Sequence, residues 1–120
     1  MTPDALDPED GKLVVLARAA RLRAHAPHTG VAEGAAVRDV DGRTYSAATV
    51  ENGDPTLTTS ALRGALSAAA SSGARAFEAA ALVTEGLVSE ADLALLREFG
   101  AGVPLHVAGT DGALREVRPA

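Results

Sequence analysis

Few side chains in this sequence have the chemistry of a metal ligand or a nucleophile. Its 120 residues include no cysteine and three histidines, His25, His28 and His106. His25 and His28 have a spacing that two metal ligands could share, but Pro27 interrupts any common helical face. His106 lies in a segment of alternating apolar and polar residues, which is typical of a strand. The histidines therefore predict no metal site.

Two serines stand close to the start of helical segments. Ser60 lies within T-L-T-T-S-A-L-R-G-A-L, residues 56–66, and Ser89 begins S-E-A-D-L-A-L-L-R-E-F. Ser89 and Asp92 together fit a helix-capping pattern, with carboxylates in the first turn. A serine hydroxyl becomes a nucleophile only with a base beside it, and the sequence indicates no such base near Ser60. These residues on their own favour structural roles at helix ends.

Composition and charge exclude several classes of function. The formal net charge is −5 and 2% of the residues are aromatic, so the chain lacks the basic surface and stacking platforms of nucleic-acid-binding proteins. The sequence contains no apolar run of membrane length and no signal-peptide pattern. We therefore expect a soluble, cytoplasmic protein with neither a nucleic-acid nor a membrane partner.

Alanine supplies much of the hydrophobic content, which is 47% of the residues. Small side chains allow close packing, but each buries little area. We therefore expect modest stability per residue, supplemented by association into a homo-oligomer, either a dimer or a tetramer. The length fits a single domain over residues 1–120, in which residues 1–6 are expected to be disordered.

Hydrophobic periodicity and turn residues predict the element order α-β-β-α-β-α-β-β. Asp7 is expected to cap a first helix, in which apolar residues continue at helical spacing to Ala24. Asp41-Gly42 is expected to form a hairpin turn. A helix between the third and fourth strands implies that those strands are parallel, so the predicted class is α/β with a mixed sheet. The later elements are expected at 57–70 (helix), 77–84 (strand), 89–99 (helix), 103–107 (strand) and 114–117 (strand).

Five short motifs, in the correct order, resemble those of the small homo-oligomeric cytidine deaminases. A-H-A-P-H-T-G, V-A-E-G-A-A-V and T-V-E-N are similar to A-Y-A-P-Y-S-G, F-x-V-G-A-A-L and N-V-E-N of that family. E-N-G-D-P-T-L-T-T-S-A-L-R lies without a gap on E-N-A-S-Y-G-L-T-I-C-A-E-R, and L-L-R-E-F-G matches the end of the helix that follows P-C-x-x-C. The resemblance covers nearly the whole chain and implies a three-layer fold with a mixed five-stranded sheet.

The resemblance also shows what has been replaced. In the family, zinc activates a water molecule and a glutamate transfers protons. Position by position, the first zinc ligand falls on Ser60, the glutamate on Leu62, and the two later cysteines on Ser89 and Asp92. A neutral hydroxyl is a poor zinc ligand, and leucine transfers no proton. The resemblance therefore implies a degenerate member that binds no zinc and has no catalytic residues at these positions.

The substrate-binding positions are partly altered. The family's ribose-binding Asn and Glu correspond to Thr49 and Glu51, and the Phe near the base corresponds to Val31. The family's Val two residues later corresponds to Glu33, while its arginine after the catalytic position is kept as Arg63. Glu51 is either a sugar-hydroxyl acceptor or a loop carboxylate that binds backbone amides. Arg63 either pairs with an acid across the emptied site or lies on the helix surface.

These observations lead to three hypotheses. The first is a cytidine deaminase-fold pseudoenzyme, without zinc, that binds a small ligand such as a nucleoside, or a protein partner. The second is a scaffolding homo-oligomer that has no ligand. The third, which has least support, is a hydrolase with altered metal-free chemistry around Ser60, Asp92 and Glu51. In each case we expect the starts of the second and third helices to face each other across a small polar site.

Overall fold

The computed structural model describes residues 6–120, so most of the segment predicted to be disordered, residues 1–5, lies outside the described residues. Leu6 is half-buried and packs against the core. No helix in the described part of the chain is long and apolar enough to cross a membrane. The elements are α1 (Pro8–Arg21), β1 (Gly34–Asp39), β2 (Thr44–Ala48), the 3₁₀ helix η1 (Pro55–Leu57), α2 (Ala61–Ser71), β3 (Phe77–Val83), α3 (Glu90–Phe99), β4 (Pro104–Ala108) and β5 (Leu114–Pro119).

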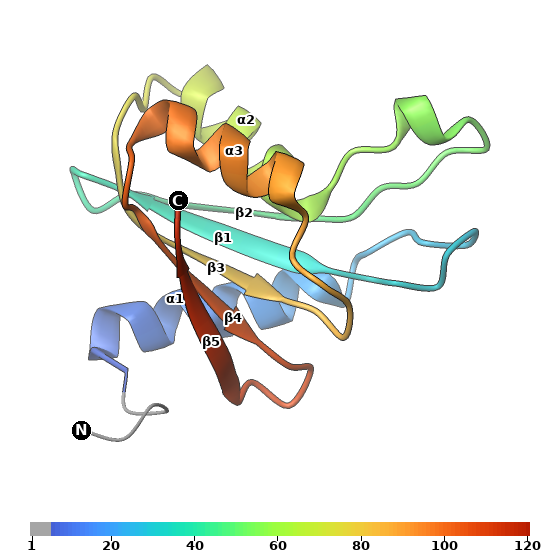
Figure 1. Ribbon diagram of the computed structural model, residues 1–120, viewed down its shortest axis with the longest axis horizontal. Helices are drawn as coiled ribbons and strands as arrows, with labels where there is room; N and C mark the ends of the chain where they lie inside the picture. The colour runs from blue at the N-terminus through green and yellow to red at the C-terminus, as the bar shows by residue number, and fades with distance from the viewer. Residues whose placement is uncertain (1–5) are drawn as a thin grey trace.

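The strands form one five-stranded sheet in the order β2-β1-β3-β4-β5, with β3 and β4 parallel and the other pairs antiparallel. Helix α1 covers one face of this sheet, and α2 and α3 cover the other (Figure 1). The predicted element order, the parallel third and fourth strands, and the three-layer α/β class are therefore confirmed.

Helix α1 ends earlier than its apolar spacing predicts. The spacing continues to Ala24, but the helix stops at Arg21. The backbone N–H of His25 donates to the carbonyl of Thr49 at 2.9 Å, and the His25 carbonyl accepts from Glu51 N–H at 2.8 Å. These bonds hold the chain in an extended conformation beside the segment that follows β2, so the helix cannot continue.

Helix α2 starts later than predicted, at Ala61 rather than near Leu57. Thr59 and Val50 exchange two backbone hydrogen bonds of 2.9 and 3.0 Å, which keep the chain extended up to the residue before the cap. Ser60 then caps the helix. The start of α2 is therefore fixed by a long-range backbone pairing as well as by the local cap.

The core has one part on each face of the sheet. Between the sheet and helices α2 and α3, leucines make up much of the buried apolar volume, whereas alanines predominate below α1. The small side chains bring α1 so close to β1 that a Cβ atom on Gly34 would lie 2.0 Å from the Ala17 carbonyl oxygen. The buried leucines of the α2/α3 side are Leu62, Leu66, Leu82, Leu93, Leu96 and Leu105.

Candidate functional site

The serine hydroxyls at the starts of α2 and α3 both serve as helix caps. Ser60 Oγ accepts the backbone N–H of Arg63 at 3.2 Å, and Ser89 Oγ accepts that of Asp92 at 3.2 Å. Each bond satisfies an amide that the helix itself leaves without a partner. Among the described residues, no side-chain base hydrogen-bonds to Ser60, so the structure gives altered chemistry at this serine no support.

Leu62 lies inside the core. Its exposed fraction is 1%, and it packs in the same cluster as Leu66 and Leu93. The first turn of α2 therefore directs a hydrocarbon side chain toward the sheet at the position where the resemblance places a proton-transferring glutamate. A leucine in this place contributes packing energy and cannot exchange a proton.

A polar cluster lies where the chain enters β1 and leaves β3. Glu33 Oε2 accepts the hydroxyl of Thr84 at 2.7 Å, and that hydroxyl accepts the N–H of Gly86 at 2.8 Å. Burial raises the pKa of the Glu33 carboxyl above its ordinary value. The hydrogen bond from Thr84 lowers this pKa, but by less than burial raises it, and the negative charge of Asp92 adds a smaller increase. The cluster therefore joins the segment before β1 to the segment after β3.

Asp92 is nearly buried, with an exposed fraction of 9%. The predicted capping pattern forms in part. Ser89 Oγ accepts the Asp92 N–H, but the Asp92 carboxylate does not accept the backbone N–H of Ser89. Within residues 6–120, that carboxylate accepts no hydrogen bond and joins no ion pair. Asp92 therefore contributes its backbone N–H, and not its carboxylate, to the cap of α3.

Glu51 binds the turn that follows α1. Its Oε1 accepts the backbone N–H groups of His28 and Thr29 at 2.9 and 3.2 Å, and its Oε2 accepts the Thr29 hydroxyl at 2.5 Å. The Thr29 hydroxyl, followed by the two amides, holds the pKa of Glu51 below its ordinary value. Glu51 therefore binds backbone amides, which is one of the two predicted roles and leaves the other untested, and it is ionised at neutral pH.

The other predicted binding residues have different environments. Thr49 is buried, and its hydroxyl accepts the backbone N–H of Glu33 at 3.0 Å. Val31 is 42% exposed and lies next to Gly86, where an added Cβ atom would come within 3.1 Å of a Val31 methyl group. Arg63 is exposed on α2 and forms none of the ion pairs found among residues 6–120, so it pairs with neither Asp92 nor Glu51, the two acids near the emptied site.

Thr84 joins the site without having been selected from the sequence, whereas Glu33 was noted there only as the replacement of the family's Val. Glu33 could have been recognised from the sequence because it is charged at a position that is apolar in the family pattern. Thr84 gives no such signal, because a single threonine at the end of an apolar strand is common. Its role depends on the register of β1 against β3, which only the folded chain defines.

The residues at the site do not fit a zinc ion. Residues 6–120 contain no group of three or more His, Cys, Asp or Glu side chains that could hold a metal. Both serine hydroxyls already accept amide hydrogens, and Asp92 is the one good ligand among the three corresponding positions. His106 lies elsewhere, with its Nε2 atom 3.4 Å from a carboxylate oxygen of Asp10 in α1.

Replacing Glu33 with glutamine is expected to stabilise the protein, by an amount that grows as the pH rises. The folded pKa of Glu33 lies above its ordinary value of 4.5, so the wild-type protein loses stability as the pH rises from the unfolded toward the folded pKa. Glutamine has nearly the same shape as glutamate and carries no charge, so the variant does not lose stability as the pH rises. Thermal unfolding of both proteins between about pH 4 and about pH 7 measures the difference. An advantage that stays constant or shrinks with pH would contradict the expectation.

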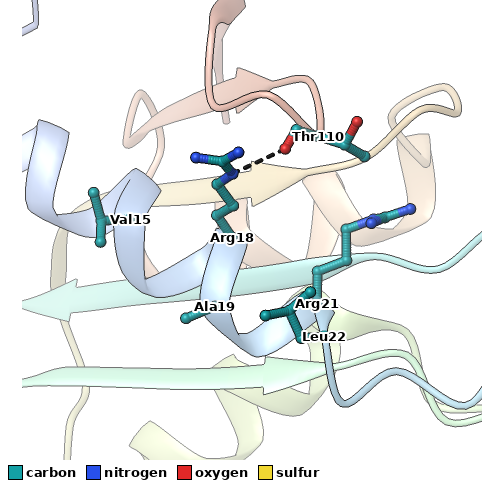
Figure 2. Close-up of a pocket in the computed structure, with 6 residues that line it drawn as sticks. All are labelled: Val15, Arg18, Ala19, Arg21, Leu22 and Thr110. Carbon is teal, nitrogen blue, oxygen red and sulfur yellow. Dashed lines mark hydrogen bonds between the residues drawn. The ribbon is translucent and has the colours of Figure 1, made fainter.

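Two cavities flank helix α1, on the sheet face opposite α2 and α3. Their volumes are about 390 and 430 Å³. Figure 2 shows the first of them, where Arg18 Nε donates to the carbonyl of Thr110 at 2.9 Å and Leu22 lies at the end of the helix, directly after its last residue. Neither cavity is lined by Thr49, Glu51 or the carboxylate cluster. These cavities are therefore separate from the positions singled out by the resemblance.

Comparison with known proteins points to one family. A family model described as cytidine deaminase-like matches residues 6–112. A cytidine deaminase of Sporosarcina psychrophila is 34% identical over 110 residues, covering 88% of this chain and 81% of the relative. The crystal structure of cytidine deaminase from Burkholderia pseudomallei superposes with a TM-score of 0.83 at 30% identity, covering 90% of each chain. That from Mycobacterium leprae has a TM-score of 0.80 at 24% identity, covering 94% of each chain, and shows likeness of fold.

Proposed function

Because this chain belongs to the cytidine deaminase-like family, we propose that it is a catalytically inactive member that binds a small ligand without zinc. The observation that carries the proposal is Leu62, packed in the core at the position of the family's proton-transferring glutamate. The capping bonds of Ser60 and Ser89 support it, since both hydroxyls are engaged with helix amides. Acid–base groups of this kind contribute about 10²–10⁴-fold to a reaction rate.

The ligand class that fits best is a nucleoside. Glu51 is ionised and has accepted three hydrogen bonds, whereas a carboxylate offers about four acceptor positions. One acceptor position therefore remains for a ligand hydroxyl. The resemblance implies that the corresponding family residue binds ribose, and the bonds from His28 and Thr29 hold this carboxylate in a fixed orientation.

A thermal-shift panel of cytidine, uridine, deoxycytidine and ribose, run in the presence of a chelator, tests this proposal. A ligand at about 100 times its dissociation constant adds about 2.7 kcal/mol to the free energy of unfolding, which raises the melting temperature by several degrees in a domain of this size. We expect at least one nucleoside to stabilise the protein, and ribose alone to have a smaller effect.

The matched variants are Glu51→Gln and Glu98→Gln. Glutamine at 51 retains one carbonyl acceptor and loses the charge, so nucleoside affinity is expected to fall about tenfold. Glu98 is exposed on α3, and its variant is expected to bind like the wild type. If no nucleoside stabilises the wild-type protein, or if both variants respond equally, a nucleoside site at Glu51 is wrong.

A scaffold without a ligand is the second candidate, and the outer face of α1 favours it. Leu22 is 83% exposed and Val15 is 66% exposed, and both line the cavity shown in Figure 2. Exposed apolar side chains on one helix face are common at contacts between proteins. No response to the nucleoside panel, together with an oligomer detected by light scattering, would favour this function over ligand binding.

A further inference from the structure

Two arginines of α1 line the cavity in Figure 2 and carry hydrogen-bond donors that the described chain does not use. Arg18 Nε donates to the Thr110 carbonyl at 2.9 Å, and Arg21 Nε donates to the Ala32 carbonyl at 2.8 Å. Within residues 6–120, the Nη atoms of both side chains form no hydrogen bond, and neither arginine joins an ion pair. Each guanidinium group is therefore anchored by one bond and keeps both of its Nη groups for a ligand.

The anchoring bonds fix where these guanidinium groups lie. Arg18 reaches from α1 to the turn between β4 and β5, where a Cβ atom built on Gly112 would lie 3.6 Å from Arg18 Nη1. Arg21 is half-buried, and its bond ties α1 to the segment before β1. Figure 2 shows both side chains extending from the same side of the helix toward the segment that holds Thr110. Because they are already held, they lose less conformational entropy on binding a ligand than free surface arginines would.

Positive charge exceeds negative charge along the wall of this cavity. The residues that line it include two arginines and no acid. Glu85 lies beside it and accepts the N–H and the hydroxyl of Thr110 at 2.9 and 2.5 Å, while Asp111 accepts the N–H of Ala113. The C-terminal end of α1 adds a partial negative charge of about half an elementary charge, which is smaller than the two full charges of the arginines. The cavity therefore favours an anion.

Apolar side chains form another part of the wall. Val15 is 66% exposed and Leu22 is 83% exposed, and Ala19 lies between them along the helix. The cavity volume of about 390 Å³ is within the range of small-molecule sites, in which a few polar groups orient a ligand against apolar walls. The cavity therefore suits a molecule that has a charged group at one end and hydrocarbon at the other.

We propose that this cavity binds a small amphipathic anion, an organic phosphate or carboxylate, whose oxygens contact Arg18 and Arg21 and whose hydrocarbon part lies against the apolar side chains. Guanidinium groups bind such oxyanions through charge-assisted and often bidentate hydrogen bonds. The site lies across the sheet from α2 and α3, so the inference goes beyond the proposed function and assigns a second binding site to the chain.

Titration of the full-length protein with four probes, followed by amide NMR spectroscopy, tests the inference. Hexyl phosphate and hexanoate carry both parts of the expected ligand, whereas hexanol lacks the charge and inorganic phosphate lacks the hydrocarbon. At least one of the two organic anions is expected to shift the amide signals of Ala19 and Thr110, with a dissociation constant of about a millimolar. Hexanol and inorganic phosphate are each expected to bind about tenfold more weakly or not at all. The tighter of the two organic anions identifies the charged group.

Four variants locate the binding. Arg18→Gln and Arg21→Gln are each expected to weaken binding of the organic anion about tenfold. Arg23→Gln removes the same charge from an exposed residue that does not line the cavity, and its affinity is expected to match that of the wild type. Leu22→Ala is expected to weaken binding of the organic anion about threefold and to leave the response to inorganic phosphate unchanged. The ligand-free spectrum of each variant verifies that it is folded before the titration.

Four outcomes would overturn the inference. They are no response to either organic anion, equal binding of hexanol, a loss in Arg23→Gln as large as in the two cavity variants, and signals that shift with protein concentration rather than with any probe. The last of these would show that the outer face of α1 contacts a second copy of the chain. Failure of the proposed function is distinguished separately, because it is measured with nucleosides and with Glu51→Gln.

Discussion

A Gly34→Ala variant is expected to lose about 3 kcal/mol or more of stability, enough to unfold a large fraction of a domain of this size. The added Cβ atom would lie 2.0 Å from the Ala17 carbonyl oxygen and 2.4 Å from the Arg21 nitrogen. Both atoms belong to the backbone of α1 and cannot rotate away, so the helix would have to move off β1. Urea denaturation followed by circular dichroism measures the loss.

The matched control is Gly11→Ala in the same helix. Apart from its chain neighbours and the backbone of its own helix, no atom lies within 4 Å of a Cβ built on Gly11, and alanine is the better helix former by up to about 1 kcal/mol. This variant is therefore expected to be as stable as the wild type or slightly more stable. A Gly34→Ala protein that unfolds at the same urea concentration as the wild type would show that α1 and β1 are less closely packed than described.

Restoring a glutamate at position 62 is expected to damage the fold and to produce no activity. Leu62 is 1% exposed and packs with Leu66 and Leu93, so Leu62→Glu would place a carboxylate in an apolar cluster. Burial of an unpaired charge, added to the lost packing, is expected to cost about 3 kcal/mol or more. Thermal unfolding measures the cost, and a cytidine turnover assay is expected to remain at background.

Leu62→Met separates the effect of charge from that of shape. Methionine has a similar volume and no charge, and such exchanges usually cost less than about 1.5 kcal/mol. The difference between the two variants therefore reports the cost of the carboxylate. A Leu62→Glu protein as stable as Leu62→Met would mean that this position has access to water or to a cation, which would contradict the packed core around α2.

Much of the fold was predictable because local signals and the global arrangement agree. The caps at Ser60 and Ser89 and the turn at Gly42, whose φ of 85° suits glycine, can be identified from short stretches of sequence. The predicted helix ends that proved wrong, near Ala24 and Leu57, depend on pairings with the segment after β2. No local pattern contains that information.

The candidate site was less predictable than the fold. The resemblance identified the replaced positions, including Leu62 and Asp92, but not the contacts of their side chains. The capping pattern gave Asp92 a structural role, whereas its carboxylate forms no hydrogen bond within residues 6–120. Glu33 and Thr84, which are 51 positions apart, come together where β1 pairs with β3, so their hydrogen bond follows from topology and register rather than from spacing.

We propose above all that this member of the family neither holds zinc nor deaminates cytidine. The most direct test is to purify the full-length protein from zinc-supplemented medium, measure its metal content by mass spectrometry, and follow uridine formation from cytidine in the same sample. We expect far less than one zinc ion per chain and no uridine above the level in buffer. One zinc ion per chain with zinc-dependent uridine formation would contradict it.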